Sequence, residues 1–288
     1  MANPILSRPD AFTARTQQPY AQQPFPQQPY GQPGYAPQGY APQGYAQPGY
    51  GQPQQFQQPQ GTMEPPMSLD DVVNKTGVTM LALMATAAAT FFFLGTLDYA
   101  VLQPATYGAL VVSGLVGFVT VLLVSARKKI SPALVLAYSL IEGVFIGAFS
   151  FMFEGMYPGI VVQAVLGTFA AAGATLAAYK FFNIRVSNKM RRMVFIGTAA
   201  FAGVMLINFV LSIFGIDLGM RSGVIGLVAA LIGVGLGVFN LVVDFDDIER
   251  GIAMNAPASE AWRAAFGITV TMVWLYTEIL RLLSYFRR

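Results

Sequence analysis

The sequence predicts an all-α polytopic membrane protein, in which a bundle of seven transmembrane helices follows a disordered N-terminal tail. The mean hydropathy is +0.52 and only 11% of the residues are charged, whereas an ordinary soluble domain carries about a quarter charged residues. Apolar runs of about 20 residues, the length that a bilayer requires, recur along the chain after residue 68. The residues before that point are rich in Pro, Gln, Gly and Tyr.

Residues 1–67 form the predicted tail and residues 68–288 the predicted membrane domain. Gly-Tyr pairs recur every five residues in the tail, at Gly34-Tyr35, Gly39-Tyr40, Gly44-Tyr45 and Gly49-Tyr50. Such a segment cannot bury enough apolar surface to offset its chain entropy, so we expect it to be disordered. Its tyrosines are open to two interpretations, as stickers for weak self-association or as parts of a solvated tether.

The predicted spans begin after Ser68, which has the pattern of a helix cap with two acids in the first turn. The first residues of the chain lack the apolar core and cleavage site of a signal peptide, so we expect the first span to serve as the insertion signal. The apolar runs place the spans at about 77–97, 106–126, 131–153, 158–179, 193–215, 223–245 and 262–285.

Basic residues gather in alternate loops, after the second and the fourth predicted spans. They are Arg127, Lys128, Lys129, Lys180, Arg185, Lys189, Arg191 and Arg192. By the positive-inside rule these loops and the N-terminal tail are cytoplasmic, in a multi-pass protein of the cytoplasmic membrane. Seven spans put the C-terminus outside, which fits poorly with Arg287 and Arg288, so a last segment that re-enters without crossing is the alternative.

The composition also excludes several chemistries. The chain has no cysteine and no histidine, which rules out disulfides, thiol redox chemistry and histidine-based metal sites or triads. Proton chemistry must therefore use carboxylates, and we do not expect an enzyme. Topology accounts for the basic residues behind the pI of about 9.1, so we expect no nucleic-acid partner.

Few polar side chains fall inside the predicted spans, where a charged group costs at least about 2.5–3.5 kcal/mol on insertion scales. The charged candidates are Glu142, Asp244, Glu278 and Arg281, and the neutral ones are Gln163, Asn208 and Asn240. We expect Asn208 and Gln163 to hydrogen-bond neighbouring helices. Glu142 lies one turn past Tyr138 and is either a structural acid or a functional one, while Glu278 is placed to pair with Arg281 one turn on.

The end of the sixth span carries the densest group of acids. Asn240, Asp244 and Asp247 share one helical stripe, at i, i+4 and i+7. We expect Asp246, Asp247 and Glu249 to form a solvated helix end. Asp244 lies deeper and is therefore the stronger functional candidate.

Small residues four apart indicate close helix packing. Such pairs are Ser113 with Gly117, Ala199 with Gly203, and Gly233 with Gly237. Packing within one bundle is favoured over dimerisation, and the oligomeric state stays open.

Three segments resemble those of Bax inhibitor-1-type membrane proteins. They are Pro132–Ser150 (PALVLAYSLIEGVFIGAFS), Val243–Ile248 (VDFDDI) and Trp274–Leu280 (WLYTEIL). The chain is similar to the actinobacterial branch, whose members also carry Gln/Pro/Tyr tails, and the resemblance covers about residues 62–288. It implies seven helices with a central last helix, in a bacterial cytoplasmic membrane.

The resemblance also implies a passive calcium leak, governed by a pH-sensitive pair of carboxylates between the sixth and seventh spans. Asp244, four residues before Ile248, and Glu278, after Leu275-Tyr276-Thr277, match the positions of that pair. The family's usual residue at the second position is Asp, and the Arg that some members carry in the second span has no counterpart before Arg127.

Two carboxyls a few ångströms apart in a low dielectric cannot both ionise cheaply, so they share a proton. Protonated, they latch the helices together; deprotonated, they repel and offer oxygen ligands to Ca²⁺, a permeant ion rather than a cofactor. Helix geometry argues against contact between these two carboxyls. Measured along each helix from the same end of the bundle, Glu278 lies about 22 Å beyond Arg263, while Asp244 lies only about 8 Å inward from Glu249. The two meet only if the seventh span begins well below the bilayer surface or tilts strongly.

Two other function classes remain as hypotheses. Some bacterial relatives modulate a membrane-bound quality-control protease, so a non-transporting regulator that engages such a partner through the tail is the alternative. An intramembrane aspartyl-type protease is the weakest hypothesis, because Asp244 and Glu278 satisfy its need for two facing acids only loosely.

Overall fold

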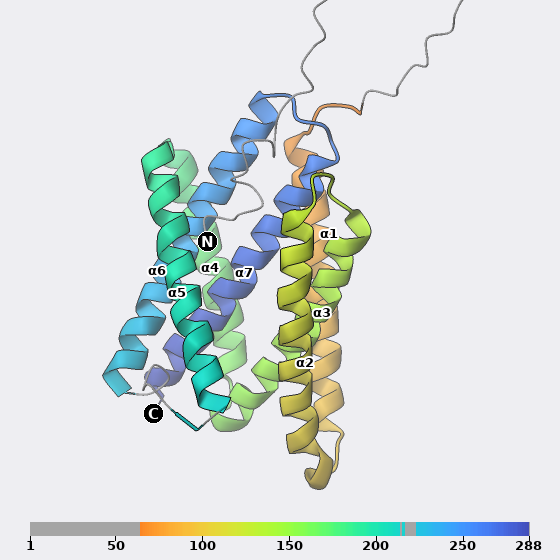
Figure 1. The fold of residues 1–288 in the computed structure, drawn as a ribbon, viewed down its shortest axis with the longest axis vertical. Coiled ribbons are helices and arrows are strands. Elements are labelled where there is room, and N and C mark those ends of the chain that lie inside the picture. The colour runs from red at the N-terminus through yellow and green to blue at the C-terminus, as the bar shows by residue number, and fades with distance from the viewer. Residues whose placement is uncertain (1–63, 214, 217–222, 288) are drawn as a thin grey trace, which may run out of the picture. The chain divides into compact units, whose positions relative to one another are not determined.

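The computed structural model describes residues 64–213, 215–216 and 223–287, so nearly all of the predicted tail lies outside the described residues. Figure 1 shows the helices of the described part, which contains no strand. They are α1 (Leu69–Gly95), α2 (Tyr99–Ala126), α3 (Pro132–Met156), α4 (Ile160–Phe181), α5 (Asn188–Ile213), α6 (Gly223–Ala253) and α7 (Glu260–Tyr285). All seven are long and apolar enough to cross a membrane, which confirms the predicted fold class.

Three helices extend well beyond the predicted spans: α1 and α6 by eight residues, and α2, which begins at Tyr99, by seven. Helix α1 begins at Leu69, directly after the predicted Ser68 cap: the Ser68 hydroxyl accepts the Asp71 N–H at 3.1 Å and the Asp71 carboxylate accepts the Ser68 N–H at 3.2 Å. This reciprocal capping satisfies two of the amide groups that a helix start leaves unpaired. Helix α6 runs eight residues past its predicted end, to Ala253, because the acids in that stretch are buried against other helices.

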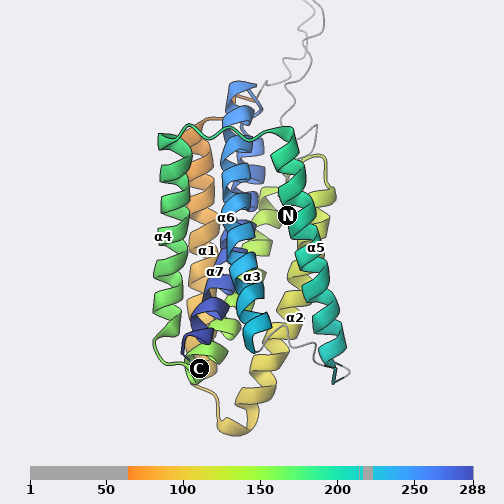
Figure 2. The same cartoon turned by 90° about the vertical axis from the view of Figure 1, so that its left-hand side faces the viewer.

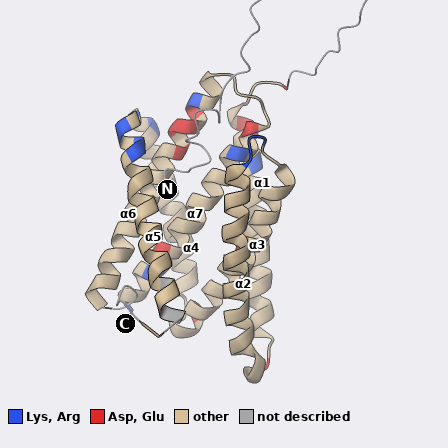
Figure 3. Cartoon of the chain, in the orientation of Figure 1, with Lys and Arg blue, Asp and Glu red and all other residues tan. Residues whose placement is uncertain are grey.

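One end of the bundle collects the loops α2–α3, α4–α5 and α6–α7, and we call it the basic end. Figure 3 shows most of the Lys and Arg residues gathered there. Arg263, 1% exposed, pairs with Glu260 at 2.6 Å and donates to the Lys128 carbonyl oxygen at 2.8 Å. Lys75 near the start of α1 donates to the Ala258 carbonyl oxygen at 2.7 Å. These bonds fasten α1, α2 and α7 to one another at this end.

Helix α7 is the central helix, as the family resemblance implied. In its most apolar 18-residue stretch 61% of the residues are buried, against 11–44% in the other six helices. Figures 1 and 2 show it running among the other helices. At its far end Arg287 donates to the Pro158 carbonyl oxygen, in the α3–α4 loop, at 2.6 Å. The last helix therefore runs the length of the bundle, and both the full crossing and the re-entrant alternative stay predictions.

Glycines set the closest helix approaches, though only partly where the sequence pointed. A Cβ on Gly237 would meet Leu275 of α7 at 3.0 Å, whereas one on Gly203 would meet nothing within 4 Å. The closest approaches to a neighbouring backbone join α3 to α1, where a Cβ on Gly143 would lie 2.6 Å from the Leu83 carbonyl oxygen. Gly147, one turn further along α3, faces the α1 backbone in the same way.

Candidate functional site

Asp244 sits in the interface between α6 and α7. Its side chain is fully buried, and its Oδ2 accepts the Thr271 hydroxyl of α7 at 2.6 Å. Asn240, one turn deeper on the same stripe, donates to the Thr198 hydroxyl of α5 at 3.0 Å. The stripe predicted on α6 is therefore buried and contacts a helix on either side.

Asp246 and Asp247 are 5% and 2% exposed, so the prediction that they form a solvated helix end is wrong. The Arg191 guanidinium of α5 bridges them, with Nη2 at 2.8 Å from Asp246 Oδ2 and Nη1 on Asp247. Arg250, one turn on, also pairs with Asp246, at 2.7 Å. The prediction holds only for Glu249, which is exposed and accepts the Tyr179 hydroxyl at 2.5 Å.

Together Asp244, Asp246 and Asp247 form what we call the α6 carboxylate cluster. Buried carboxylates persist only where cations and hydrogen bonds compensate their lost hydration. Here the compensation comes from other parts of the chain, since the Val186 N–H in the α4–α5 loop also donates to Asp246 at 3.2 Å. The cluster thus ties α6 to α5, to the preceding loop and to α7.

Glu278 lies elsewhere along the same interface. It pairs with Arg281 on its own helix at 2.9 Å and faces Gly233 of α6, where a Cβ would lie 2.5 Å from its Oε2. Gly233 precedes Asp244 by 11 residues, or about 16 Å of helix. The structure therefore does not bring Asp244 and Glu278 together, in line with the objection raised by residue counting.

Two neutral residues depart from expectation. Asn208 is 1% exposed, yet among the described residues neither its Oδ1 nor its Nδ2 has a hydrogen-bond partner. Gln163 is exposed on α4. Neither makes the interhelical hydrogen bond that was predicted for it.

Neither the contact of Thr271 with Asp244 nor the bridging role of Arg191 was predicted from the sequence. Several buried threonines bond to their own helix, as Thr168 does with the Ala164 carbonyl oxygen at 2.7 Å, so a hydroxyl inside a span does not by itself indicate an interhelical contact. Arg191 stands in a run of basic residues that topology already explains.

Glu142 lies away from that interface, in a cavity of about 270 Å³ between α2, α3 and α7. A Cβ on Gly117 of α2 would lie 2.8 Å from its Oε2. Tyr138, one turn before it, lines the same cavity, and no hydrogen bond joins the two side chains in the described structure.

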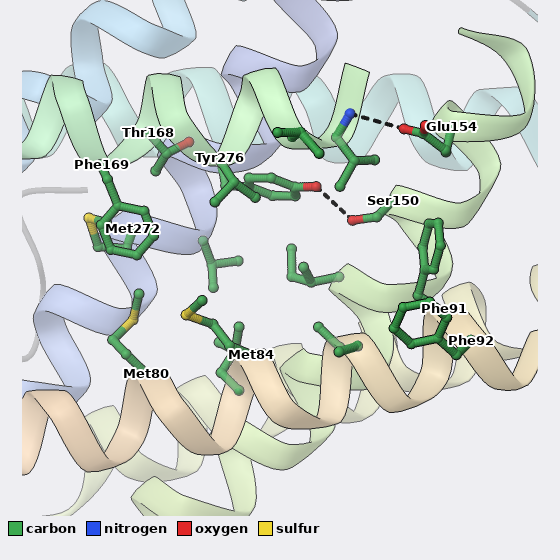
Figure 4. Close-up of a pocket in the computed structure, with 18 residues that line it drawn as sticks. Met80, Met84, Phe91, Phe92, Ser150, Glu154, Thr168, Phe169, Met272 and Tyr276 are labelled. Carbon is green, nitrogen blue, oxygen red and sulfur yellow. Dashed lines mark hydrogen bonds between the residues drawn. The ribbon is translucent and has the colours of Figure 1, made fainter. Parts of the chain in front are cut away.

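A larger cavity of about 430 Å³ lies between α1, α3, α4 and α7 (Figure 4). Its wall is mostly apolar, and its polar groups are bonded to one another or to backbone. The Ser150 and Tyr276 hydroxyls are 2.6 Å apart, and Glu154 accepts the Val161 N–H at 3.1 Å. This cavity therefore presents no carboxylate that lacks a donor.

Within the residues that the structure describes, no group of three or more acidic side chains is arranged to hold a metal ion.

The fold and its buried acids define a class, that of seven-span helical membrane proteins with ionisable groups inside the bundle. A family model described as Bax inhibitor 1 like matches residues 3–288, and the chain belongs to this family. The match begins well before residue 62, where the motif resemblance was expected to start. A search of curated proteins gave no match. The assignment to the actinobacterial branch stays a prediction.

Proposed function

We propose that the protein is a passive, pH-sensitive cation leak pathway of the bacterial cytoplasmic membrane, with Ca²⁺ as the permeant ion. Membership of the Bax inhibitor 1 like family is consistent with this function. The observation that carries the proposal is Asp244, a fully buried carboxyl bonded across the α6–α7 interface. It adjoins two further carboxylates at the basic end of the bundle.

The proposed orientation follows from charge. The Lys and Arg residues at the basic end favour a cytoplasmic location for that end and for the N-terminal tail. Cytosolic protons would then reach Asp244 by way of the other two acids of the α6 carboxylate cluster, Asp246 and Asp247. Cytosolic protons and permeating Ca²⁺ would then both reach Asp244 along the α6–α7 interface.

In the proposed closed state Asp244 carries a proton and accepts the Thr271 hydroxyl, which holds α6 against α7. Loss of that proton places a third negative charge beside Asp246 and Asp247, where Arg191 and Arg250 already balance two. Repulsion then favours separation of the helices and frees oxygens that suit Ca²⁺. Rising cytosolic pH would shift the population toward the open state.

Glu278 takes a different part in this scheme from the one that the family pairing implies. Because it lies two turns past Thr271, about 10 Å along α7, sharing a proton with Asp244 would need a slide larger than a one-turn helix shift. We propose instead that Asp244 and Glu278 are successive acidic positions that a cation meets along the α6–α7 interface. Asp244 is the pH-sensing group of the two.

The test is calcium flux into dye-loaded liposomes that contain the full chain, measured from pH 6 to pH 8. Wild type should leak more at high pH, and Asp244→Asn should give a flux that no longer depends on pH. Glu278→Gln should lower the flux and keep its pH dependence. Asp98→Asn, a change at an exposed loop acid, is the control and should match wild type.

A wild-type flux equal to that of empty liposomes at every pH would refute the leak itself. A pH profile that Asp244→Asn leaves intact would refute the assignment of the sensor while leaving the leak standing.

A further inference from the structure

The cavity that holds Glu142 is built differently from the rest of the bundle interior. Aromatic rings from three helices line it: Phe118 of α2, Tyr138 and Phe145 of α3, and Trp274 of α7. Glu142 is the one acidic side chain in its wall. The volume of about 270 Å³ is just below the range of about 300–1,000 Å³ typical of small-molecule sites.

The neighbouring polar groups are engaged elsewhere. The Trp274 Nε1–H donates to the Gly233 carbonyl oxygen at 3.0 Å, and the Thr277 hydroxyl donates to the Trp274 carbonyl oxygen at 2.9 Å. Within the described residues, no side chain donates a hydrogen bond to Glu142 or forms an ion pair with it. An acid at membrane depth without such compensation is costly when charged, so it calls for a partner.

We propose that this cavity binds a lipophilic organic ammonium ion, with Glu142 as the counter-charge and the four rings as cation–π partners. Carboxylate and aromatic faces together are the combination that recognises such cations. Ca²⁺ fits less well, because it takes six to eight oxygen ligands and the side chains of this wall offer one carboxyl and the Tyr138 and Thr277 hydroxyls. Phe118 is 50% exposed on the outer surface of the bundle, so the cavity is reached from the bilayer, where lipophilic cations dissolve.

Binding is coupled to a proton. In the empty cavity Glu142 keeps its proton, since a neutral carboxyl avoids the cost of an uncompensated charge. The entering ammonium supplies the missing positive charge, and the carboxyl proton leaves to the solvent. Tyr138 is the other titratable side chain facing Glu142, and the walls from α2 and α7 contribute none. Affinity for a permanently charged ammonium therefore rises with pH.

The experiment uses the full chain in lipid nanodiscs and the fluorescence of Trp274. The chain has two tryptophans, so Trp262→Phe leaves Trp274 as the single reporter. The probes are benzyltrimethylammonium and neopentylbenzene, its uncharged isostere. We expect saturable quenching by the cation and at least about tenfold weaker binding of the isostere. Cation affinity should be higher at pH 8 than at pH 6.

Glu142→Gln should weaken cation binding at least about tenfold and abolish its pH dependence. Gly117→Ala should weaken it as well, since the added Cβ would lie 2.8 Å from the carboxyl oxygen. Asp98→Asn is the control, because it neutralises an exposed loop acid that lines no part of this cavity, and it should bind like the parent. Size-exclusion profiles check that each variant is folded.

Equal binding of the two probes, equal binding by Glu142→Gln, or quenching that rises linearly without saturation would each overturn the proposal. So would quenching by Ca²⁺ with no response to the ammonium ion. Calcium flux of Glu142→Gln, measured in parallel, separates this site from the proposed leak, since the two can fail independently.

Discussion

The acids of the α6 carboxylate cluster and Glu278 of α7 are neutralised in different ways. Asp246 and Asp247 share Arg191, 55 and 56 residues earlier in the chain and on another helix, and Asp246 also pairs with Arg250 on its own helix. Glu278 takes its charge from Arg281, three residues on. A pair between helices breaks when the helices part, whereas a pair within one helix moves with it. The α6 carboxylate cluster can therefore respond to helix packing, and Glu278 stays compensated through any rigid movement of α7.

The largest effect should come from Arg191→Met. Removing this cation leaves two buried carboxylates short of a partner, and breaking a buried pair on one side costs about 3–5 kcal/mol. Thermal unfolding in detergent should show a large loss of stability. Arg192→Met, at the exposed neighbouring position, is the matched control and should change little. Equal effects of the two changes would mean that the cross-helix pairing contributes nothing.

The second-largest loss of stability should come from Gly233→Ala, which tests the placement of Glu278 against α6. The new Cβ would lie 2.5 Å from Glu278 Oε2, so α6 and α7 must separate or Glu278 must turn away, at a cost of about 1–3 kcal/mol. Gly235→Ala, whose Cβ would meet nothing within 4 Å, should be neutral or slightly stabilising. Unfolding curves of the two variants side by side measure the difference, and identical curves would contradict the placement of Glu278 against α6.

Most of the helical architecture could be predicted from the sequence. A bilayer fixes span length and excludes charge, so seven apolar runs gave seven helices, and the Ser68 pattern marked a cap that the structure confirms. The predicted boundaries of the first and sixth spans stop short of the helix ends, because both helices continue into polar stretches. A helix may continue outside the apolar core wherever caps or ion pairs support it, and hydropathy does not register such support.

The site was harder to predict than the fold, because its partners are distant in sequence. Nothing near Asp246 or Asp247 indicates that Arg191 will cover them, so a solvated helix end was the natural expectation. Counting residues did raise the correct objection to an Asp244–Glu278 contact, since helical rise is fixed. It could not identify Thr271 as the partner that Asp244 has instead.

A smaller effect is expected from Thr271→Val, which removes the hydroxyl bonded to Asp244 and keeps the side-chain shape. One hydrogen bond contributes about 0.5–1.5 kcal/mol net, so stability should fall by about that amount. Calcium leak should rise at low pH, because the proposed closed state loses its link between α6 and α7. Thr168→Val is the control, since Thr168 bonds only to its own helix at the Ala164 carbonyl. A leak that is unchanged at every pH would separate this bond from gating.

The smallest effect should come from Glu278→Gln. The amide keeps the shape of the side chain and can still accept a hydrogen bond from Arg281, so the loss of stability should be smaller than for the three changes above. A double-mutant cycle with Arg281→Met gives the coupling energy of the α7 pair, and the cycle of Asp247→Asn with Arg191→Met gives that of the cross-helix pair. We expect the second coupling to be clearly larger, since Asp247 is 2% exposed and its cation belongs to another helix. If the α7 pair proved the more strongly coupled, pairing across helices would not be what makes the α6 carboxylate cluster strong, and the contrast between the two regions would be wrong.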